Sequence, residues 1–115
     1  MTLRTKRIHE APAKGDGTRV LVDRLWPRGV SKEKARLDAW VRGVAPSNEL
    51  RKWFAHDPAK WQEFRKRYFK ELDANAEAVE EVRALVAKGT ATLLFAAKDE
   101  EHNNAVALRE YLETR

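Results

Sequence analysis

The stretch VLVDRLWPRGVSKEK, residues 20–34, is the most informative part of the sequence about the architecture of the protein. Its three leading apolar residues are typical of a strand covered on both faces, which we place at residues 18–25. Asp23 and Arg24 follow those residues directly, and Trp26 stands before a proline. A residue before proline is pushed to an extended conformation, so the chain is expected to leave the strand in a loop. The sequence thus predicts a buried strand that ends in charged and aromatic side chains.

A second buried strand is predicted at residues 90–96, TATLLFA, and a short strand at residues 3–9. Residues 37–44 alternate like a strand but also fit helical spacing, and we favour a short strand there. Capping residues and apolar spacing indicate five helices. They are a short one after Ser31, one through Phe54 capped by Ser47, one over residues 58–73 capped by Asp57, one over residues 76–88 that ends at Gly89, and a last one capped by Asp99.

Helices between two buried strands indicate a crossover that joins parallel strands. The expected fold class is therefore α/β, with a small, mainly parallel sheet and helices packed around it. A chain of 115 residues is long enough for one hydrophobic core, and no repeat or linker divides it. We expect a single compact domain over residues 1–115.

The composition excludes several classes of protein. Cysteine is absent, which rules out disulfide scaffolds, thiolate catalysis and cysteine-ligated zinc. Three histidines without cysteine predict no metal site, and no cofactor motif is found, so we expect no metal and no cofactor. The basic N-terminal residues lack the apolar core of a signal peptide, and no apolar run approaches the roughly 18 residues of a membrane span. We expect a cytoplasmic protein without a membrane partner.

Three motifs, in this order along the chain, resemble the YeaO-like family of small bacterial proteins. They are VLVDRLWPRG (residues 20–29), APSNELRKWFAHDPAKWQEFRKRYFKEL (residues 45–72) and TLLFAAKDEEHNNA (residues 92–105). Together they extend the resemblance over nearly the whole chain. The resemblance implies a compact α/β fold. Because the family is defined as a domain of unknown function, the resemblance implies no particular activity.

Polar side chains gather where the two buried strands end. In open parallel sheets, ligands bind beyond the carboxyl ends of the strands, and the ends of parallel strands share one edge. The residues that follow these two strands, together with one arginine of a helix, are therefore expected to form a pocket. Candidates for binding a ligand are Arg24, Trp26, Arg28, Arg51, Lys98 and Asn103, and candidates for acid–base catalysis are Asp23, Asp99 and His102.

Several of these residues also have a structural interpretation. Asp23 can hold loop amides at the strand end, and Trp26 fits a pocket wall better than a reacting group. His56 and Asp57 resemble a catalytic dyad, but Asp57 is better explained as a helix cap, which leaves His56 as a loop residue. Asp99 and the two glutamates after it would place carboxylates at the N-terminus of the last helix, where the helix dipole is positive. A bound anion would then depend on basic side chains rather than on helix amides.

Two functions fit these observations. The net charge of +5 favours anionic partners. In the first hypothesis, arginines hold a small phosphate- or carboxylate-bearing ligand at the strand ends, with acid–base catalysis as an extension. The alternative is a nucleic-acid-binding or regulatory module that uses the basic face of the helix over residues 58–72. That face consists of Lys60, Arg65, Lys66, Arg67 and Lys70, whereas the aromatic residues Trp53, Phe54, Trp61, Phe64 and Tyr68 are expected in the core.

Overall fold

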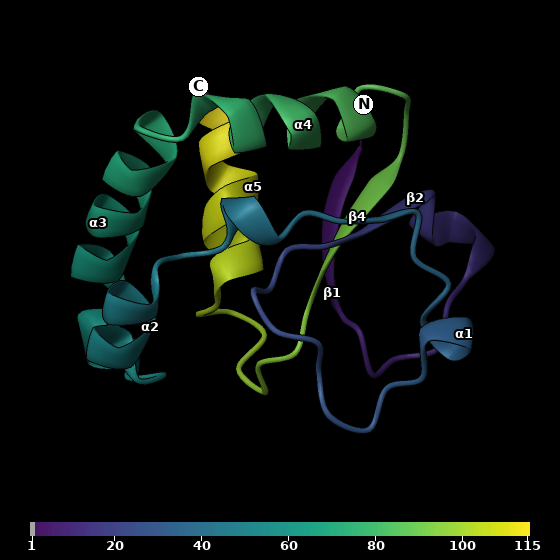
Figure 1. Ribbon diagram of the computed structural model, residues 1–115, viewed down its shortest axis with the longest axis horizontal. Coiled ribbons are helices and arrows are strands. Elements are labelled where there is room, and N and C mark those ends of the chain that lie inside the picture. Colours follow the sequence, from purple (N-terminus) through teal and green to yellow (C-terminus); the bar gives the residue numbers. More distant parts are fainter. Residues whose placement is uncertain (1) are drawn as a thin grey trace.

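The computed structural model describes residues 2–115 and contains a four-stranded sheet in which all strands are parallel (Figure 1). The spatial order is β1-β4-β2-β3, so β4 lies between β1 and β2. The predicted α/β class and the predicted parallel pairing of the two buried strands are confirmed. The strands are β1 (Leu3–Arg7), β2 (Thr18–Leu21), β3 (Ala39–Trp40) and β4 (Ala91–Phe95).

In the part of the chain that the structure describes, five α-helices pack around the sheet. Figure 1 shows α4 and α5 beside the strands, α3 on the far side of α5, and α1 at the opposite side of the sheet. Within residues 2–115, none of them combines the length and the apolarity needed to cross a membrane. The helices are α1 (Lys32–Ala35), α2 (Asn48–Phe54), α3 (Trp61–Asp73), α4 (Ala76–Val86) and α5 (Asn104–Thr114).

The strand β2 is covered on both faces, as its apolar run predicts. Val20 and Val22 point into the larger core, which α2 to α5 complete. Leu21 points to the other face and packs in a smaller core with Ala35 of α1 and Leu94 of β4. Side chains alternate between the two faces of a strand. Three consecutive apolar residues are therefore needed only where both faces of the sheet are covered and excluded from water.

Three of the predicted helix caps are confirmed. The side-chain oxygens of Ser31 and Ser47 accept hydrogen bonds from the amides of Lys34 and Leu50, at 3.0 and 3.1 Å. Asp57 accepts from the Ala59 amide at 3.0 Å and begins a 3-10 turn that leads into α3.

The predicted start of the last helix is wrong. The α5 helix begins at Asn104, and its cap is Asn103, whose side chain accepts from the Val106 amide at 3.0 Å. Asp99 instead accepts from the amides of Glu101 and His102 and stabilises a turn before the helix. The acidic residues therefore do not fill the N-terminus of α5.

The strand favoured for residues 37–44 is mostly wrong. Only Ala39–Trp40 pair with β2, and a 3-10 turn, Arg42–Val44, follows. The mixed spacing of this segment reflects two short elements in succession. The strand predicted at residues 18–25 is also shorter than expected, because ladder pairing ends at Leu21.

Of the five aromatic residues expected in the core, Phe54, Phe64 and Tyr68 are buried, whereas Trp53 is only partly buried. The Tyr68 hydroxyl donates to the carbonyl of Val44 at 2.6 Å. Burial raises the pKa of Tyr68 above its usual range, so this hydroxyl stays a donor. Trp61, at the first turn, is only partly buried.

At the amino end of β2, the chain enters the strand through a tight turn at Gly17. This glycine has a positive φ of 65°, and a Cβ placed on it would overlap the backbone carbonyl of Thr90. The same carbonyl accepts from the Thr18 amide at 3.0 Å. A buried ion pair between Asp16 and Arg19 lies at the same end of the strand. The close approach of two backbones explains why glycine occupies this position.

Candidate functional site

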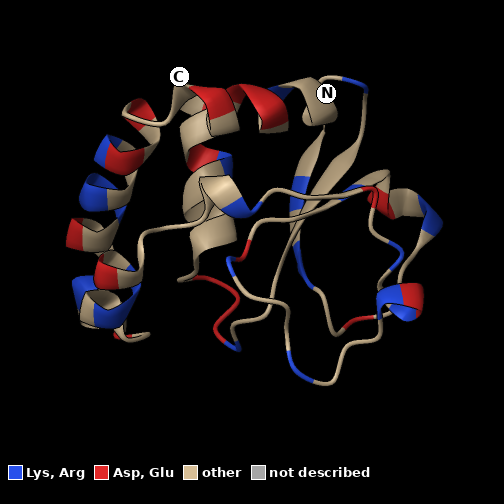
Figure 2. Ribbon diagram, viewed as in Figure 1, with Lys and Arg blue, Asp and Glu red and all other residues tan. Residues whose placement is uncertain are grey.

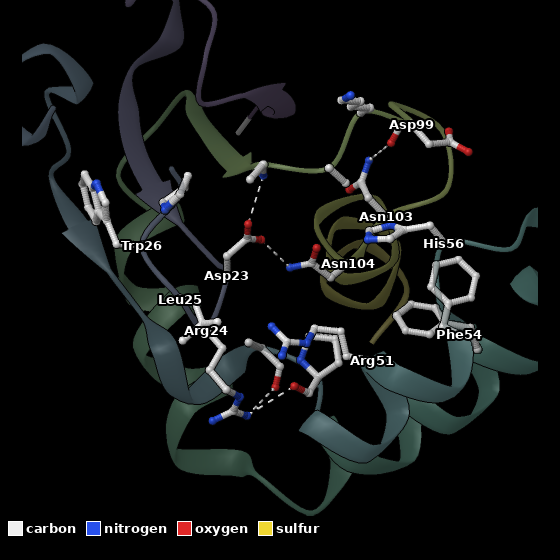
Figure 3. A pocket seen from close by; sticks show the side chains of 17 residues that line it. Asp23, Arg24, Leu25, Trp26, Arg51, Phe54, His56, Asp99, Asn103 and Asn104 are labelled. Carbon is white, nitrogen blue, oxygen red and sulfur yellow. Dashed lines mark hydrogen bonds between the residues drawn. The ribbon is translucent and has the colours of Figure 1, made fainter. Parts of the chain in front are cut away.

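A cavity of about 690 Å³ opens at the carboxyl ends of β2 and β4 (Figure 3). Its walls come from the loop after β2, the loop after β4, α2 and the start of α5. Figure 3 shows Asp23 between Trp26 on one side and Phe54 and His56 on the other. The lining residues are Asp23, Arg24, Leu25, Trp26, Pro27, Ala45, Pro46, Arg51, Phe54, His56, Phe64, Ala96, Ala97, Lys98, Asp99, Asn103 and Asn104.

The structure brings most of the candidate residues together, because the two strands are parallel and their ends share an edge. Arg28 and His102 are not among the lining residues, and Arg28 is exposed. The candidates that line the cavity are Asp23, Arg24, Trp26, Arg51, Lys98, Asp99 and Asn103.

Asp23 links three elements at the floor of the cavity. One carboxylate oxygen accepts from the Ala96 amide and the other from the Asn104 side chain, both at 3.0 Å. Burial raises the pKa of Asp23, and these hydrogen bonds together with the positive charges of Arg51 and His56 offset part of that rise. Asp23 therefore ties the ends of β2 and β4 to the start of α5.

The raised pKa of Asp23 predicts a dependence of stability on pH. Because the pKa is higher in the folded state than in the unfolded state, the Asp23 contribution to the free energy of unfolding is greatest below the unfolded value. This contribution falls as pH rises through the folded value. In Asp23→Asn the contribution is absent. Urea denaturation between about pH 4 and pH 7 should show the wild type losing stability relative to the variant as pH rises, by about 1.4 kcal/mol for each unit of pKa difference.

The lowered pKa values of Asp16 and Asp99 act in the opposite direction but are common to both proteins. The difference between wild type and variant therefore isolates Asp23. A difference in unfolding free energy that stays constant over this pH range would contradict the prediction.

Arg24 is held by backbone groups rather than by an acid. One terminal nitrogen of its guanidinium donates to the carbonyls of Ala45 and Pro46, both at 3.3 Å, as Figure 3 shows. Its Nε atom is buried without a hydrogen-bond partner within residues 2–115. Arg24 thus fixes the loop before α2, and its Nε donor stays unused.

Two further basic side chains lie at the cavity and are exposed to solvent. Arg51 comes from α2 and Lys98 from the loop after β4. Among residues 2–115, neither forms an ion pair or a side-chain hydrogen bond. The cavity therefore offers two basic side chains that form no ion pair, although the charge of Arg51 also acts on the nearby carboxylate of Asp23.

The carboxylate of Asp99 is already engaged. Besides the two turn amides, it contacts Nδ1 of His102 at 2.9 Å. The His102 ring also packs edge-on against Trp61, with ring centroids 5.4 Å apart. Hydrogen bonds from the turn amides and from His102 lower the pKa of Asp99, so this carboxylate is ionised near neutral pH.

Ten of the 17 lining residues are not among the residues predicted from the sequence, and three of these bear on the site: Leu25, His56 and Asn104. His56 was interpreted as a loop residue, yet the turn after α2 brings it to the cavity. Ala55 and His56 both have positive φ values, 48° and 57°, which is uncommon outside glycine. The doublet Asn103-Asn104 was a usable signal, because one asparagine caps the helix while the next points to Asp23.

The basic face of α3 is neutralised in part, because two of its five basic residues form ion pairs. Arg65 pairs with Glu110, and Arg67 pairs with Glu63 at 3.0 Å. Lys60 donates to a backbone carbonyl at 2.8 Å. Figure 2 shows basic and acidic residues alternating along this helix.

Comparison with known proteins identifies the family. The family model described as "Inactive DUF488-N3 subclade" matches residues 2–115, and the chain belongs to this family. An uncharacterized protein of Mycobacterium tuberculosis (strain ATCC 25618 / H37Rv) is 39% identical over 113 residues, which cover 98% of this chain and 95% of the relative. The uncharacterized protein YeaO of Escherichia coli (strain K12) is 37% identical over 112 residues, 97% of each chain. The resemblance to the YeaO-like family is thus confirmed, and no solved structure matches the chain.

Proposed function

We propose that this protein binds a small phosphate- or carboxylate-bearing molecule in the strand-end cavity. The main support is the distribution of unpaired positive charge. Of the basic side chains that line the cavity, Arg24, Arg51 and Lys98 have no acidic partner within residues 2–115. An arginine can hold an oxyanion through paired hydrogen bonds, and a lysine adds a point charge.

Binding without catalysis is the better-supported form of this proposal. Both oxygens of Asp23 already accept hydrogen bonds, and Asp99 is occupied by its own turn and by His102. Neither carboxylate has an oxygen left without a hydrogen bond. His102 itself does not line the cavity. The description of the family as inactive agrees with a protein that holds a ligand without converting it.

The proposal is tested by removing the two exposed charges. Arg51→Gln combined with Lys98→Gln should lower the affinity for inorganic phosphate at least about tenfold, because hydrogen bonds to charged groups contribute about 1.5–3 kcal/mol each. Chemical shifts of backbone amides, followed during a phosphate titration, measure weak affinities and locate the site. In the wild type, the shifts should concentrate around the cavity.

A charge-matched control is available on α3, where Lys66 and Lys70 are exposed. The double variant Lys66→Gln/Lys70→Gln removes the same charge and should change the phosphate affinity by no more than about twofold, because solvent screens distant charges. Equal losses in both double variants would mean that net charge alone attracts the anion. A loss confined to the α3 variant would instead favour the nucleic-acid alternative on the basic helix.

A further inference from the structure

The cavity is larger and more apolar than an inorganic anion requires. Its volume of about 690 Å³ falls in the range of sites that hold organic ligands of drug size. The unpaired side chains of Arg51 and Lys98 form only part of the lining of the cavity. Most of the remaining wall consists of aliphatic, proline and aromatic side chains.

Leu25 is the clearest apolar feature of this wall. It is 62% exposed and is the only large hydrophobic side chain that is exposed within residues 2–115. It lies in the loop after β2, directly between Arg24 and Trp26. An exposed leucine alone is common, but one that lines a cavity offers apolar area that a ligand can cover.

Two aromatic walls are held rigidly on either side of Asp23 (Figure 3). On one side, Trp26 donates its indole N–H to the carbonyl of Val30 at 2.8 Å and meets Trp40 edge to face at 5.4 Å. On the other side, Phe54 stacks on Phe64 with ring centroids 4.3 Å apart. Walls that are already packed and hydrogen-bonded lose little freedom when a ligand binds.

We propose that the ligand is an aromatic acid, a planar ring that carries one carboxylate or phosphate group. The acidic group contacts Arg51 and Lys98, and the ring packs against Leu25 between the walls of Trp26 and Phe54. This inference rests on the proposed function, because it names the class of anion that the same cavity holds. Aromatic rings suit such a site because they bury a large apolar area and stack on other rings.

The test compares matched probes with and without the ring. Phenyl phosphate should bind at least about tenfold more tightly than inorganic phosphate, and benzoate more tightly than acetate, since each ring adds buried apolar area. Calorimetric titration measures the affinities, and quenching of tryptophan fluorescence gives a second readout of binding. In Leu25→Ser, most of the advantage of phenyl phosphate should disappear while the affinity for inorganic phosphate stays unchanged. Because Leu25 is exposed, this variant is expected to fold normally.

Each outcome separates this inference from the proposed function. Equal affinities for phenyl phosphate and inorganic phosphate would overturn the aromatic ligand and leave anion binding intact. An advantage of phenyl phosphate that survives in Leu25→Ser would place the ring elsewhere and would also overturn the inference. If benzamide, which has the ring without the acid, binds as tightly as benzoate, anion recognition fails and the proposed function falls. If no probe binds, both are overturned.

Discussion

Phe64→Ala is expected to lower the free energy of unfolding by about 3–5 kcal/mol, the usual cost of emptying an aromatic site in a core. Phe64 is 2% exposed and stacks on both Phe54 and Trp61, with ring centroids at 4.3 and 5.6 Å. Phe54 and Trp61 also contact each other, at 6.0 Å, so the variant removes one ring of a three-ring cluster. Chemical denaturation followed by circular dichroism gives the value.

The matched control is Phe69→Ala, which lies on the same helix and makes the same change in helix propensity. Phe69 is only partly buried, so the loss should be clearly smaller than for Phe64→Ala. A loss below about 1 kcal/mol for Phe64→Ala would mean that this face of α3 does not support the core.

Gly17→Ala is expected to destabilise the protein by roughly 2–5 kcal/mol, from two separate effects. The left-handed conformation costs an alanine about 1–2 kcal/mol, and the overlap with the backbone of Thr90 costs about 1–3 kcal/mol more. Backbone atoms cannot move aside as a side chain can, and here they carry the hydrogen bond from Thr18 that starts the pairing of β2 with β4. Thermal and urea denaturation measure the loss.

Gly29→Ala separates the two effects. Gly29 also has a positive φ, 75°, but a Cβ placed on it meets nothing within 4 Å. Only the conformational cost of about 1–2 kcal/mol should remain. If Gly17→Ala and Gly29→Ala are equally stable, a small backbone shift relieves the overlap at Gly17. The close approach of Gly17 to Thr90 would then contribute less to stability than its geometry implies.

The central part of the site could be predicted from the sequence because it depends on one topological rule. Once two apolar strands are separated by helices, they are parallel, and the residues after them meet at one edge. Asp23 and Lys98 are 75 positions apart in the sequence (98 minus 23), and this rule alone was enough to place both at the cavity.

The errors arise where several local signals compete or where tertiary contacts decide. Asp99 and Asn103 are both good capping residues, and in the structure Asp99 caps a separate turn while Asn103 caps α5. Arg28 was expected at the ligand, but the hydrogen bond from Trp26 to the Val30 carbonyl closes the loop with Arg28 exposed. The spacing of residues in this loop does not specify how it folds back on itself.

His56 illustrates the same limit for the cavity itself. Its place beside Asp23 depends on how α2 packs against α3, which brings the turn after α2 toward the end of β2. The sequence around His56 indicates only that a helix ends and another begins. The two consecutive left-handed residues that redirect the chain there carry no glycine, the usual marker of such a turn.

The order of the strands has a consequence for how the protein is made. β1 lies at an edge and pairs with β4, and its residue Leu3 is opposite Ala91. As the nascent chain leaves the ribosome, β1 and β2 therefore have no bridge between them until residues 91–95 emerge. Such non-local pairing slows folding and leaves apolar strands exposed in the meantime. Insertion of β4 completes the sheet and at the same time brings together the two sides of the cavity. A nascent chain that has not yet reached β4 therefore has neither the complete sheet nor the cavity.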